Sequence, residues 1–303
     1  MERNILLHRT SRYLARCLTN YTKQEIKGID NIPKDGPVIL ISNHVNWADP
    51  IIIGGCVRRD LYALAKLELF SNPLSNLFVQ KIGAQPYDRE NPFNKVNVRS
   101  IGYLIDKLSQ NEALLLFGEG TRSLDGTLGD IYPDPIKIAQ RLEKKYDIKP
   151  KYVTCAITYE SELGLFGRFY LQINEPSEFD SEYNVEHWQE KLKTEIGLSI
   201  KVLPQFLVSY FLHERVILRK EDLFEGIVLS TEKLKEAGAN YDERLLDHEK
   251  AIEEVNKELD NLFQNSIIYS TRDNYVHVSN KEALETNHNR IMHLEDVLKQ
   301  PTP

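Results

Sequence analysis

The sequence predicts an α/β fold, in which helices flank a central mixed, mostly parallel sheet. An N-terminal amphipathic helix and a helical C-terminal extension are expected to lie outside this core. Short runs of β-branched and aliphatic residues are typical of buried strands, and the chain has three of them: PVILIS (37–42), ALLLF (113–117) and YVTCAIT (152–158). Stretches with helical spacing separate these runs, and such alternation favours parallel pairing.

The helical patterns divide the chain into three segments. Pro50 opens a helix after the first strand, and apolar residues recur at helical spacing over 98–108 and 136–142, before the second and third strands. Beyond residue 215 two charged amphipathic helices are expected over 221–238 and 242–263, followed by a short hairpin over 267–270 and 275–278. We therefore expect an amphipathic helix over 1–27, a main α/β domain over 28–215 and an acidic, mainly helical extension over 216–303.

Composition narrows the cellular setting. The three cysteines of the 303 residues are scattered without a CxxC pair, which favours a reducing compartment over a zinc site or a disulfide framework. No stretch approaches the roughly 20 apolar residues of a membrane-spanning helix. The first residues carry too much charge for a secretory signal. A cytoplasmic protein is expected.

Charge is distributed unevenly along the chain. Residues 1–27 hold six Lys and Arg against two acids, whereas residues 216–303 hold 11 against 18. The basic segment includes an amphipathic pattern over 3–21, so the protein is expected to rest peripherally on the inner face of a membrane, on anionic lipid. The alternatives are a solvated surface and a helix docked on its own domain. The apolar stretch LPQFLVSYFL (203–212) is a second candidate for membrane contact. No basic stripe with interleaved aromatic residues suggests nucleic acid.

The loop SNHVNWADP (42–50) follows the first strand and carries a histidine and an aspartate five residues apart. In open α/β sheets ligands bind at the carboxyl ends of strands. His44 near the Asp49 carboxylate is typical of a general base whose tautomer is fixed by its neighbour. The alternative for Asp49 is an ordinary helix N-cap with Pro50 at the first helical position.

The loop FGEGTRS (117–123) follows the second strand. Gly118 and Gly120 allow the backbone to turn tightly and present N–H groups to an anion, Thr121 adds a hydroxyl, and Arg122 can grip phosphate bidentately. Arg89, at the end of GAQPYDR (83–89), is a second candidate for phosphate. The alternatives are a plain strand-to-loop turn and a surface arginine.

Metal chemistry is not expected from the sequence. Three aspartates after the second loop do not match an EF-hand and are interpreted as solvated loop acids. The remaining histidines form no cluster with ligand spacing. The aspartates are Asp125, Asp130 and Asp134, and the histidines are His8, His187, His213, His248, His277, His288 and His293.

The ordered set NHVNWAD, GAQPYDR and FGEGTRS resembles the glycerolipid acyltransferase family over roughly residues 25–175. That family transfers acyl groups from acyl-CoA or acyl carrier protein to glycerol phosphate or 1-acylglycerol 3-phosphate. The resemblance implies that His44 is the general base and that Asp49 orients it. It also implies that Arg89 and the loop Gly118, Glu119, Gly120, Thr121 and Arg122 bind the phosphate of the acceptor. The strand at 152–158 is then expected to help line the acyl site.

Two departures from the family pattern lead to expectations of their own. The family usually has proline where this chain has Gly118, which predicts a looser turn. The stretch GDIYPDPIKIAQ (129–140) lacks the small Lys-Gly segment common in the family, so a different acyl pocket is expected.

The expected function is an O-acyltransferase that uses an acyl thioester as co-substrate, with no other cofactor and no metal. The expected acceptor is 1-acylglycerol 3-phosphate. Glycerol 3-phosphate or another lysophospholipid is the alternative, and the tail ETNHNRIMHLED (285–296) faintly resembles larger glycerol-3-phosphate acyltransferases. A non-catalytic lipid-binding protein on the same fold is the alternative from another class. Donors for the tetrahedral oxyanion are expected among the backbone N–H groups of 118–120.

Overall fold

The computed structural model describes residues 24–72, 76–77, 79, 83–123, 127–160, 168–215, 217–270 and 274–295. The chain forms two compact units, one of residues 1–122 with 130–196 and the other of residues 123–129 with 197–303. The helix expected over 3–21 lies outside the described residues.

The first unit is built on an eight-stranded sheet in the order β1-β7-β6-β2-β5-β3-β4, with β8 paired to β6. The pairs β1–β7, β6–β2, β2–β5, β5–β3 and β3–β4 are parallel, and β6 pairs antiparallel with β7 and β8. The prediction of a mixed, mostly parallel sheet is confirmed. The strands are β1 Gln24–Lys27, β2 Val38–Ser42, β3 Leu61–Lys66, β4 Ala84–Tyr87, β5 Ala113–Phe117, β6 Lys151–Tyr159, β7 Phe169–Ile173 and β8 Ser177–Glu178.

The three strands predicted from apolar runs lie side by side at the centre of this sheet. All five residues of β2 are buried, as are the residues of β6 after Lys151. Because both faces are covered, every side chain of such a strand meets the core, and its sequence is apolar without alternation. β3 and β4 were not predicted, because alanine is depleted in strands and β4 also contains proline.

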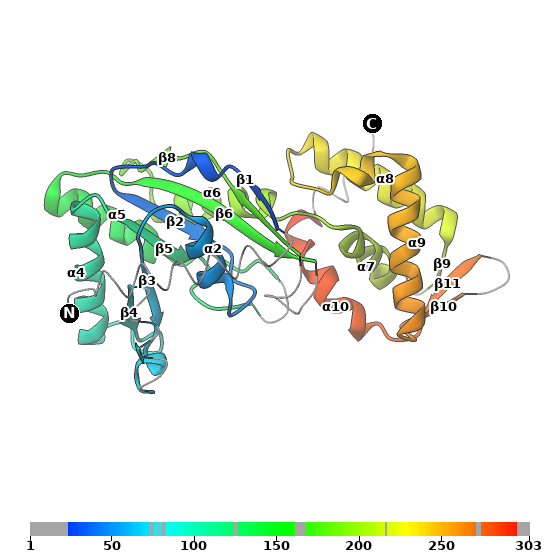
Figure 1. Ribbon diagram of the computed structural model, residues 1–303, viewed down its shortest axis with the longest axis horizontal. Helices are drawn as coiled ribbons and strands as arrows, with labels where there is room; N and C mark the ends of the chain where they lie inside the picture. Colours follow the sequence, from blue (N-terminus) through cyan, green and yellow to red (C-terminus); the bar gives the residue numbers. More distant parts are fainter. Residues whose placement is uncertain are drawn as a thin grey trace. The chain divides into compact units, whose positions relative to one another are not determined.

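Helices cover both faces of the sheet (Figure 1). One face carries α2. On the other, Tyr62 of β3 lies against Tyr103 of α4, and Tyr152 of β6 contacts Trp188 of α6 and donates a hydrogen bond to the Pro135 carbonyl of α5. The helices are α2 Asp49–Cys56, α4 Lys95–Ser109, α5 Asp134–Tyr146 and α6 Val185–Ser199, with 3₁₀ turns η1 Ile29–Asn31 and η2 Leu67–Phe70. The helices predicted around 98–108 and 136–142 are confirmed.

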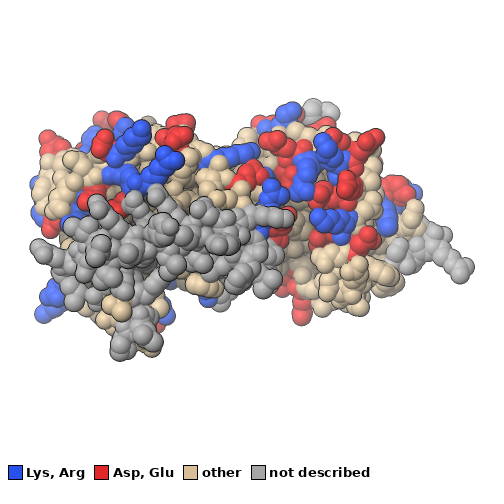
Figure 2. Space-filling view, viewed as in Figure 1, with Lys and Arg blue, Asp and Glu red and all other residues tan. Residues whose placement is uncertain are grey.

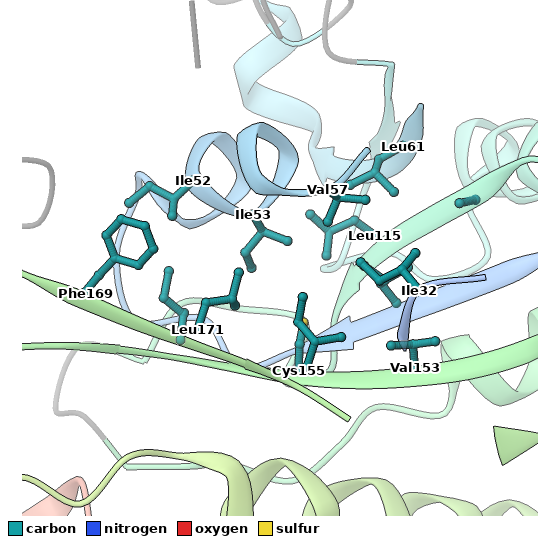
Figure 3. Close-up of a cluster of buried hydrophobic side chains, with 14 of the residues drawn as sticks. Ile32, Ile52, Ile53, Val57, Leu61, Leu115, Val153, Cys155, Phe169 and Leu171 are labelled. Atoms are coloured by element: carbon teal, nitrogen blue, oxygen red, sulfur yellow. The ribbon is translucent and has the colours of Figure 1, made fainter. Parts of the chain in front are cut away.

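Packing on the sheet fixes the position of α2. Ile52 and Ile53 point from α2 toward Cys155 and Leu171 of the sheet (Figure 3), and both isoleucines are 1% exposed or less. Burial of two such side chains stabilises the docked helix by about 3–6 kcal/mol. The helix begins at Asp49, so this packing also places the Asp49 side chain.

The second unit is mainly helical, as predicted, and contains a small sheet in the order β10-β11-β9. The predicted hairpin is confirmed as the antiparallel pair β10–β11, and β9 adds a strand that the sequence did not indicate. The elements are α7 Pro204–Glu214, β9 Ile217–Arg219, α8 Lys220–Glu236, η4 Glu243–Leu246, α9 His248–Gln264, β10 Ile268–Ser270, β11 Tyr275–Val278, α10 Glu282–Asn289 and η5 Met292–Leu294.

The division between the units differs from the predicted boundary at residue 215. It falls at Gly197, so α7 belongs to the second unit. Phe206, Leu207 and Val208 of α7 are fully buried. The expectation that 203–212 forms a surface for membrane contact is therefore wrong, because this stretch forms part of a core.

The exposed surface of the second unit carries both signs of charge. Acidic and basic side chains are interspersed over it on the face shown in Figure 2. Arg244 pairs with Asp242 at 2.6 Å and also with Glu254, and Lys250 pairs with Asp247 at 3.0 Å. The Lys250–Asp247 pair is exposed and contributes little to stability. The Asp242 side chain is only 7% exposed, so its pair with Arg244 is partly buried. Among the described residues, no helix has both the length and the apolar character needed to cross a bilayer.

Candidate active site

The two predicted loops leave the sheet side by side. β2 and β5 are parallel neighbours, and Ser42 at the end of one pairs with Phe117 at the end of the other. Past the strand ends, the Gly118 N–H donates to the Ser42 carbonyl at 2.9 Å, and the His44 N–H donates to Oε1 of Glu119 at 3.1 Å. The first loop is thus bonded to the second at two points.

His44 and Asp49 meet directly. Nδ1 of His44 lies 2.8 Å from Oδ2 of Asp49, whose side chain is fully buried. The same oxygen accepts the N–H groups of Val45 and Asn46 at 2.8 Å each, and Oδ1 accepts the Tyr159 hydroxyl at 2.5 Å. A buried carboxylate is favourable only when its oxygens are satisfied in this way.

This geometry excludes the interpretation of Asp49 as an ordinary N-cap. The N-cap residue of α2 is Ala48, and no side chain caps the helix. The carboxylate of Asp49 bonds backward, to the loop before the helix, instead of forward to the amides of its first turn. The packing of α2 on the sheet and the hydrogen bonds from the loop together hold the Asp49 side chain in place.

The arrangement determines the tautomer of His44. A carboxylate only accepts hydrogen bonds, so Nδ1 of His44 carries the proton and Nε2 keeps a lone pair. The imidazole also stacks on Phe117, with ring centroids 4.0 Å apart and planes at 21°. A histidine held by a carboxylate and by an aromatic ring, with Nε2 unprotonated, can remove a proton from a hydroxyl group.

Three contributors to the site were not predicted. Phe117 supports the His44 ring, and Tyr159 donates to Asp49 from the carboxyl end of β6. Burial, and secondarily the Asp49 carboxylate, raises the pKa of Tyr159, so its hydroxyl stays protonated as a donor. Asn43 bonds both the N–H and the carbonyl of Ile157, at 2.9 and 3.0 Å. Tyr159 directly follows YVTCAIT, so its place at a strand end was the available signal.

Arg89 lies against the second loop. Its guanidinium carbon is 5.2 Å from the Tyr132 ring centroid, and Nη2 is 3.6 Å from where a Cβ on Gly120 would lie. Thr121 and Arg122 follow Gly120 directly, and both are exposed. Within the described part of the chain, no carboxylate forms a salt bridge with either arginine. The structure thus brings Arg89 to the loop that carries Arg122.

The turn at Gly118 is not loose, contrary to the expectation from the missing proline. Its N–H donates to Ser42, and its carbonyl accepts the Tyr132 N–H at 2.8 Å. A Cβ at this position would lie 2.6 Å from Cδ1 of Ile131 and 3.2 Å from Cγ2 of Ile41. The isoleucines occupy the space that a larger residue would need, so hydrogen bonds and packing fix the turn.

The same hydrogen bonds correct the assignment of oxyanion donors. The Gly118 N–H is bonded to Ser42, and the Gly120 N–H donates to the Phe117 carbonyl at 2.9 Å. Two of the three amides expected to stabilise the oxyanion are therefore already used within the loop. The prediction is wrong for these two glycines.

Other sequence interpretations change with the fold. Asp134 is not a solvated loop acid, because it lies in the first turn of α5 and accepts the Tyr87 hydroxyl at 2.7 Å. The side chains of β6 pack in the core, and their role in lining an acyl site stays a prediction. His213, Glu214 and His288 do form a cluster with ligand geometry in the second unit, contrary to the sequence interpretation. Burial, and secondarily His288, lowers the pKa of His213.

Comparison with known proteins gives the class of this region. The acyltransferase family model matches residues 23–158, the stretch that contains both loops and the strands that carry them. The resemblance to the glycerolipid acyltransferase family is thereby confirmed for this part of the chain.

The individual relatives are more particular. The chain is 36% identical over 95 residues to the 1-acyl-sn-glycerol-3-phosphate acyltransferase of Bacillus subtilis, covering 31% of this chain and 46% of that protein. It is 32% identical over 103 residues to the Streptococcus pneumoniae protein of the same name, covering 33% and 38%. The match thus spans less than half the length of these relatives. The solved PlsC acyltransferase of Thermotoga maritima aligns with 62% of this chain and 80% of its own, at 22% identity and a TM-score of 0.47.

Proposed function

We propose that the protein is an O-acyltransferase that moves a fatty acyl group from a thioester to the free hydroxyl of 1-acylglycerol 3-phosphate. The observation that carries the proposal is the His44–Asp49 pair, bonded at 2.8 Å and set beside the loop that carries Arg122 and that Arg89 lies against. This pair lies inside a segment that matches the acyltransferase family. Two relatives over this segment are named for the same acceptor.

His44 acts as the general base in the proposed mechanism. Nε2 takes the proton of the acceptor hydroxyl as its oxygen attacks the thioester carbonyl carbon. The tetrahedral intermediate collapses with cleavage of the carbon–sulfur bond, and the imidazolium returns the proton to the departing thiolate. An ester and a free thiol result. Asp49 stabilises the imidazolium between the two proton transfers.

Arg89 and Arg122 bind the phosphate of the acceptor. A planar guanidinium matches two phosphate oxygens, so a pair of arginines fixes both the position and the orientation of the group. With the phosphate held, only a hydroxyl at the right distance reaches Nε2 of His44. The arginines thus supply proximity and regiochemistry without touching the reacting carbon.

Contact with a membrane is part of the proposal, because the acceptor is a lipid. The first unit exposes one large apolar side chain within a motif loop and another shortly after the motif GAQPYDR. Trp47 is 61% exposed and lies between His44 and Asp49 in sequence, and Phe93, four residues after Arg89, is 93% exposed. Exposed aromatic side chains beside a site suit an interface with lipid. The basic segment 1–27 would add attraction to anionic headgroups on the inner face of a membrane.

A thiol-release assay tests the activity. The purified full chain is given acyl-CoA or acyl carrier protein thioester with 1-acylglycerol 3-phosphate, glycerol 3-phosphate or a lysophospholipid with a head group. Release that depends on 1-acylglycerol 3-phosphate, with formation of the diacyl product, is the expected result. Turnover restricted to another acceptor would replace the assigned acceptor. Lipid binding without turnover on any acceptor would contradict the enzyme assignment.

A vesicle co-sedimentation series tests the membrane contact separately. Binding should require anionic lipid, weaken as salt rises, and fall on removal of residues 1–23, which leaves β1 intact. Trp47→Ala and Phe93→Ala should also weaken it, whereas Tyr183→Ala, at an aromatic residue that is 49% exposed and precedes α6, should not. Unchanged binding by the truncated chain and by both alanine variants would contradict this part of the proposal.

A further inference from the structure

Two helices of the second unit bring two histidines and a glutamate together. His213 and Glu214 lie in the last turn of α7, and His288 lies in α10. Oε1 of Glu214 is 3.4 Å from Nε2 of His288 and 3.9 Å from Nδ1 of His213. The three potential ligand atoms all lie within 4.8 Å of one another. Residues 75 positions apart (288 − 213) thus converge on one point.

The two imidazole nitrogens that face this point lack hydrogen-bond partners. Nδ1 of His213 and Nε2 of His288 are both buried without a partner among the described residues. The His288 side chain is 7% exposed, so bulk solvent has little access to it. Buried polar atoms are almost always paired, and these two nitrogens beside one carboxylate can each accept a further partner.

Acceptor oxygens face both nitrogens of His288. Nδ1 lies 3.3 Å from Oδ1 of Asn289, and Nε2 lies 3.4 Å from Oε1 of Glu214. When a metal ion takes the lone pair of Nε2, Nδ1 can keep its proton and donate it to Asn289. The ring is held between Tyr210, at a centroid distance of 5.7 Å, and His213, at 4.0 Å. His288 is thus oriented in advance.

We propose that His213, Glu214 and His288 bind a divalent transition-metal ion, with Zn²⁺ as the best match. Two imidazole nitrogens and one carboxylate oxygen are ligands that zinc accepts, with water in the fourth position. Metal–ligand bonds of about 2.1 Å in a tetrahedron separate neighbouring ligand atoms by about 3.4 Å. The observed 3.4 and 3.9 Å are close to this separation.

Binding requires the His213 ring to turn out of its stack on His288. The ring centroids are 4.0 Å apart and the planes differ by 29°, so the lone pairs do not converge as the rings stand. His213 is 21% exposed and Glu214 is 49% exposed, so both can turn toward the fixed His288. The position at the end of α7 also favours a cation, because the last carbonyls of a helix carry partial negative charge.

The metal would tie α10 to the end of α7 within the second unit. Each histidine comes from a different helix, so one ion replaces two unpaired nitrogens with bonds that span the contact. We expect bound zinc to raise the unfolding temperature of the chain and to slow hydrogen exchange over 282–289. This role is separate from acyl transfer, so it stands or falls independently of the proposed function.

Zinc binding to the untagged full chain tests the proposal. Protein stripped with a chelator is dialysed against Zn²⁺ near neutral pH, and bound metal is counted per chain. Competition with a chromophoric chelator gives the Kd, and Co²⁺ in place of zinc reports tetrahedral geometry through its visible spectrum. One equivalent per chain and a tetrahedral cobalt spectrum are the expected results.

Matched glutamine variants locate the site. Each of His213→Gln and Glu214→Gln should weaken zinc binding by at least about 100-fold, more than the loss of an outer-sphere partner. His248→Gln, an exposed histidine at the start of α9 in the same unit, should bind like wild type. His288→Gln should also lose the metal, but because that residue is buried, the less buried positions 213 and 214 decide the test. Fewer than one equivalent in wild type, or wild-type Kd in both the His213→Gln and Glu214→Gln variants, would overturn the proposal. A histidine–glutamate ion pair that titrates without metal uptake would give that result.

Discussion

Each unit of the molecule sets histidine beside a carboxylate, and the two sites are built in opposite ways. In the first unit, Asp49 is fully buried, and its oxygens accept hydrogen bonds from His44, Tyr159 and two backbone amides. In the second, Glu214 is 49% exposed, and the two imidazole nitrogens that face it have no partner among the described residues. In the first unit, every oxygen of the carboxylate has hydrogen-bond partners, which hold the His44 ring in one tautomer and suit proton transfer. In the second unit, these two imidazole nitrogens have no such partners among the residues that the structure describes, which suits binding of a ligand.

Removal of the imidazole at position 44 should have the largest effect. His44→Ala should lower kcat by about 10²–10⁴-fold, because a positioned general base is lost. The unfolding temperature should change little, since Asp49 keeps its bonds to Val45, Asn46 and Tyr159. Thiol release and calorimetry measure the two quantities. His187→Ala, an exposed histidine on α6 of the same unit, is the control and should retain full activity. Equal rates in the two variants would contradict the role of His44.

Asp49→Asn separates the structural role of Asp49 from its electrostatic effect on His44. The amide oxygen can still accept from Val45 and Asn46, so the loop should keep its shape. A neutral side chain no longer stabilises the imidazolium, so kcat should fall nearly as far as in His44→Ala. Circular dichroism checks the fold, and steady-state kinetics the rate. A variant that turns over at the wild-type rate would reduce Asp49 to a purely structural residue.

Arg89 and Arg122 of the first unit also lack a salt-bridge partner within the described part of the chain. The ligand that we expect them to bind is an anion. Arg89→Ala and Arg122→Ala should each raise KM for the phosphorylated acceptor by about 10- to 100-fold, from the loss of about 1.5–3 kcal/mol of charge-assisted hydrogen bonding. Arg122→Lys should restore part of this, because lysine keeps the charge without the planar fork. Arg58→Ala, exposed before β3 at the opposite edge of the sheet, is the control. A selective rise in the KM of the thioester would mean that these arginines bind the donor.

Substitutions at Gly118 and at its neighbour Ile131 test whether packing fixes the Gly118 turn. A Cβ at this position meets Cδ1 of Ile131 at 2.6 Å, so Gly118→Ala should destabilise the chain by about 1–3 kcal/mol. Ile131→Val removes that atom and should recover most of the loss in the double variant. When Gly118→Pro is combined with Ile131→Val, less of the stability should be recovered, because proline also lacks the N–H that donates to Ser42. Denaturant unfolding of the four variants gives the coupling energy, and strict additivity would show that the two positions do not interact.

The smallest effect is a pH dependence in the second unit. Burial raises the pKa of Glu258 on α9 to about 7 from an ordinary value of 4.5. Between these values the folded chain binds a proton that the unfolded chain has released, so stability falls as pH rises through this window. Glu258→Gln mimics the protonated form. It should raise the unfolding temperature by a few degrees at pH 8 and much less at pH 5, in metal-free buffer. The same gain at both pH values would contradict this account.

The sequence predicted what depends on local pattern. β2, β5 and β6 lie at the centre of the sheet, where a strand is apolar on both faces, so a continuous apolar run identified each one. The proximity of His44 to the Gly118 loop followed from the rule that parallel strands end at the same edge. β3 was missed because Leu61–Lys66 contains two alanines, which are depleted in strands, and no β-branched residue.

The remainder depends on pairings that no local pattern encodes. Tyr159 reaches Asp49 across 110 residues, and His288 reaches Glu214 across 74 (288 − 214). The helix at 204–214 was taken for a surface because its apolar residues show no polar face, yet such a helix is also what a core requires. Only the tertiary structure shows whether such an apolar helix lies in the core or on the surface.

The contact between Gly118 and Ile131 carries a consequence for how this loop evolves. With Ile131 in place, alanine or proline at 118 meets a side chain that fills its space, so adding a side chain at this position is costly. We expect the order of changes to matter, with position 131 becoming smaller before position 118 can gain a side chain. Ile131 thus makes replacement of glycine at position 118 unfavourable. A reconstructed ancestor with proline at 118 should carry a residue smaller than isoleucine at 131.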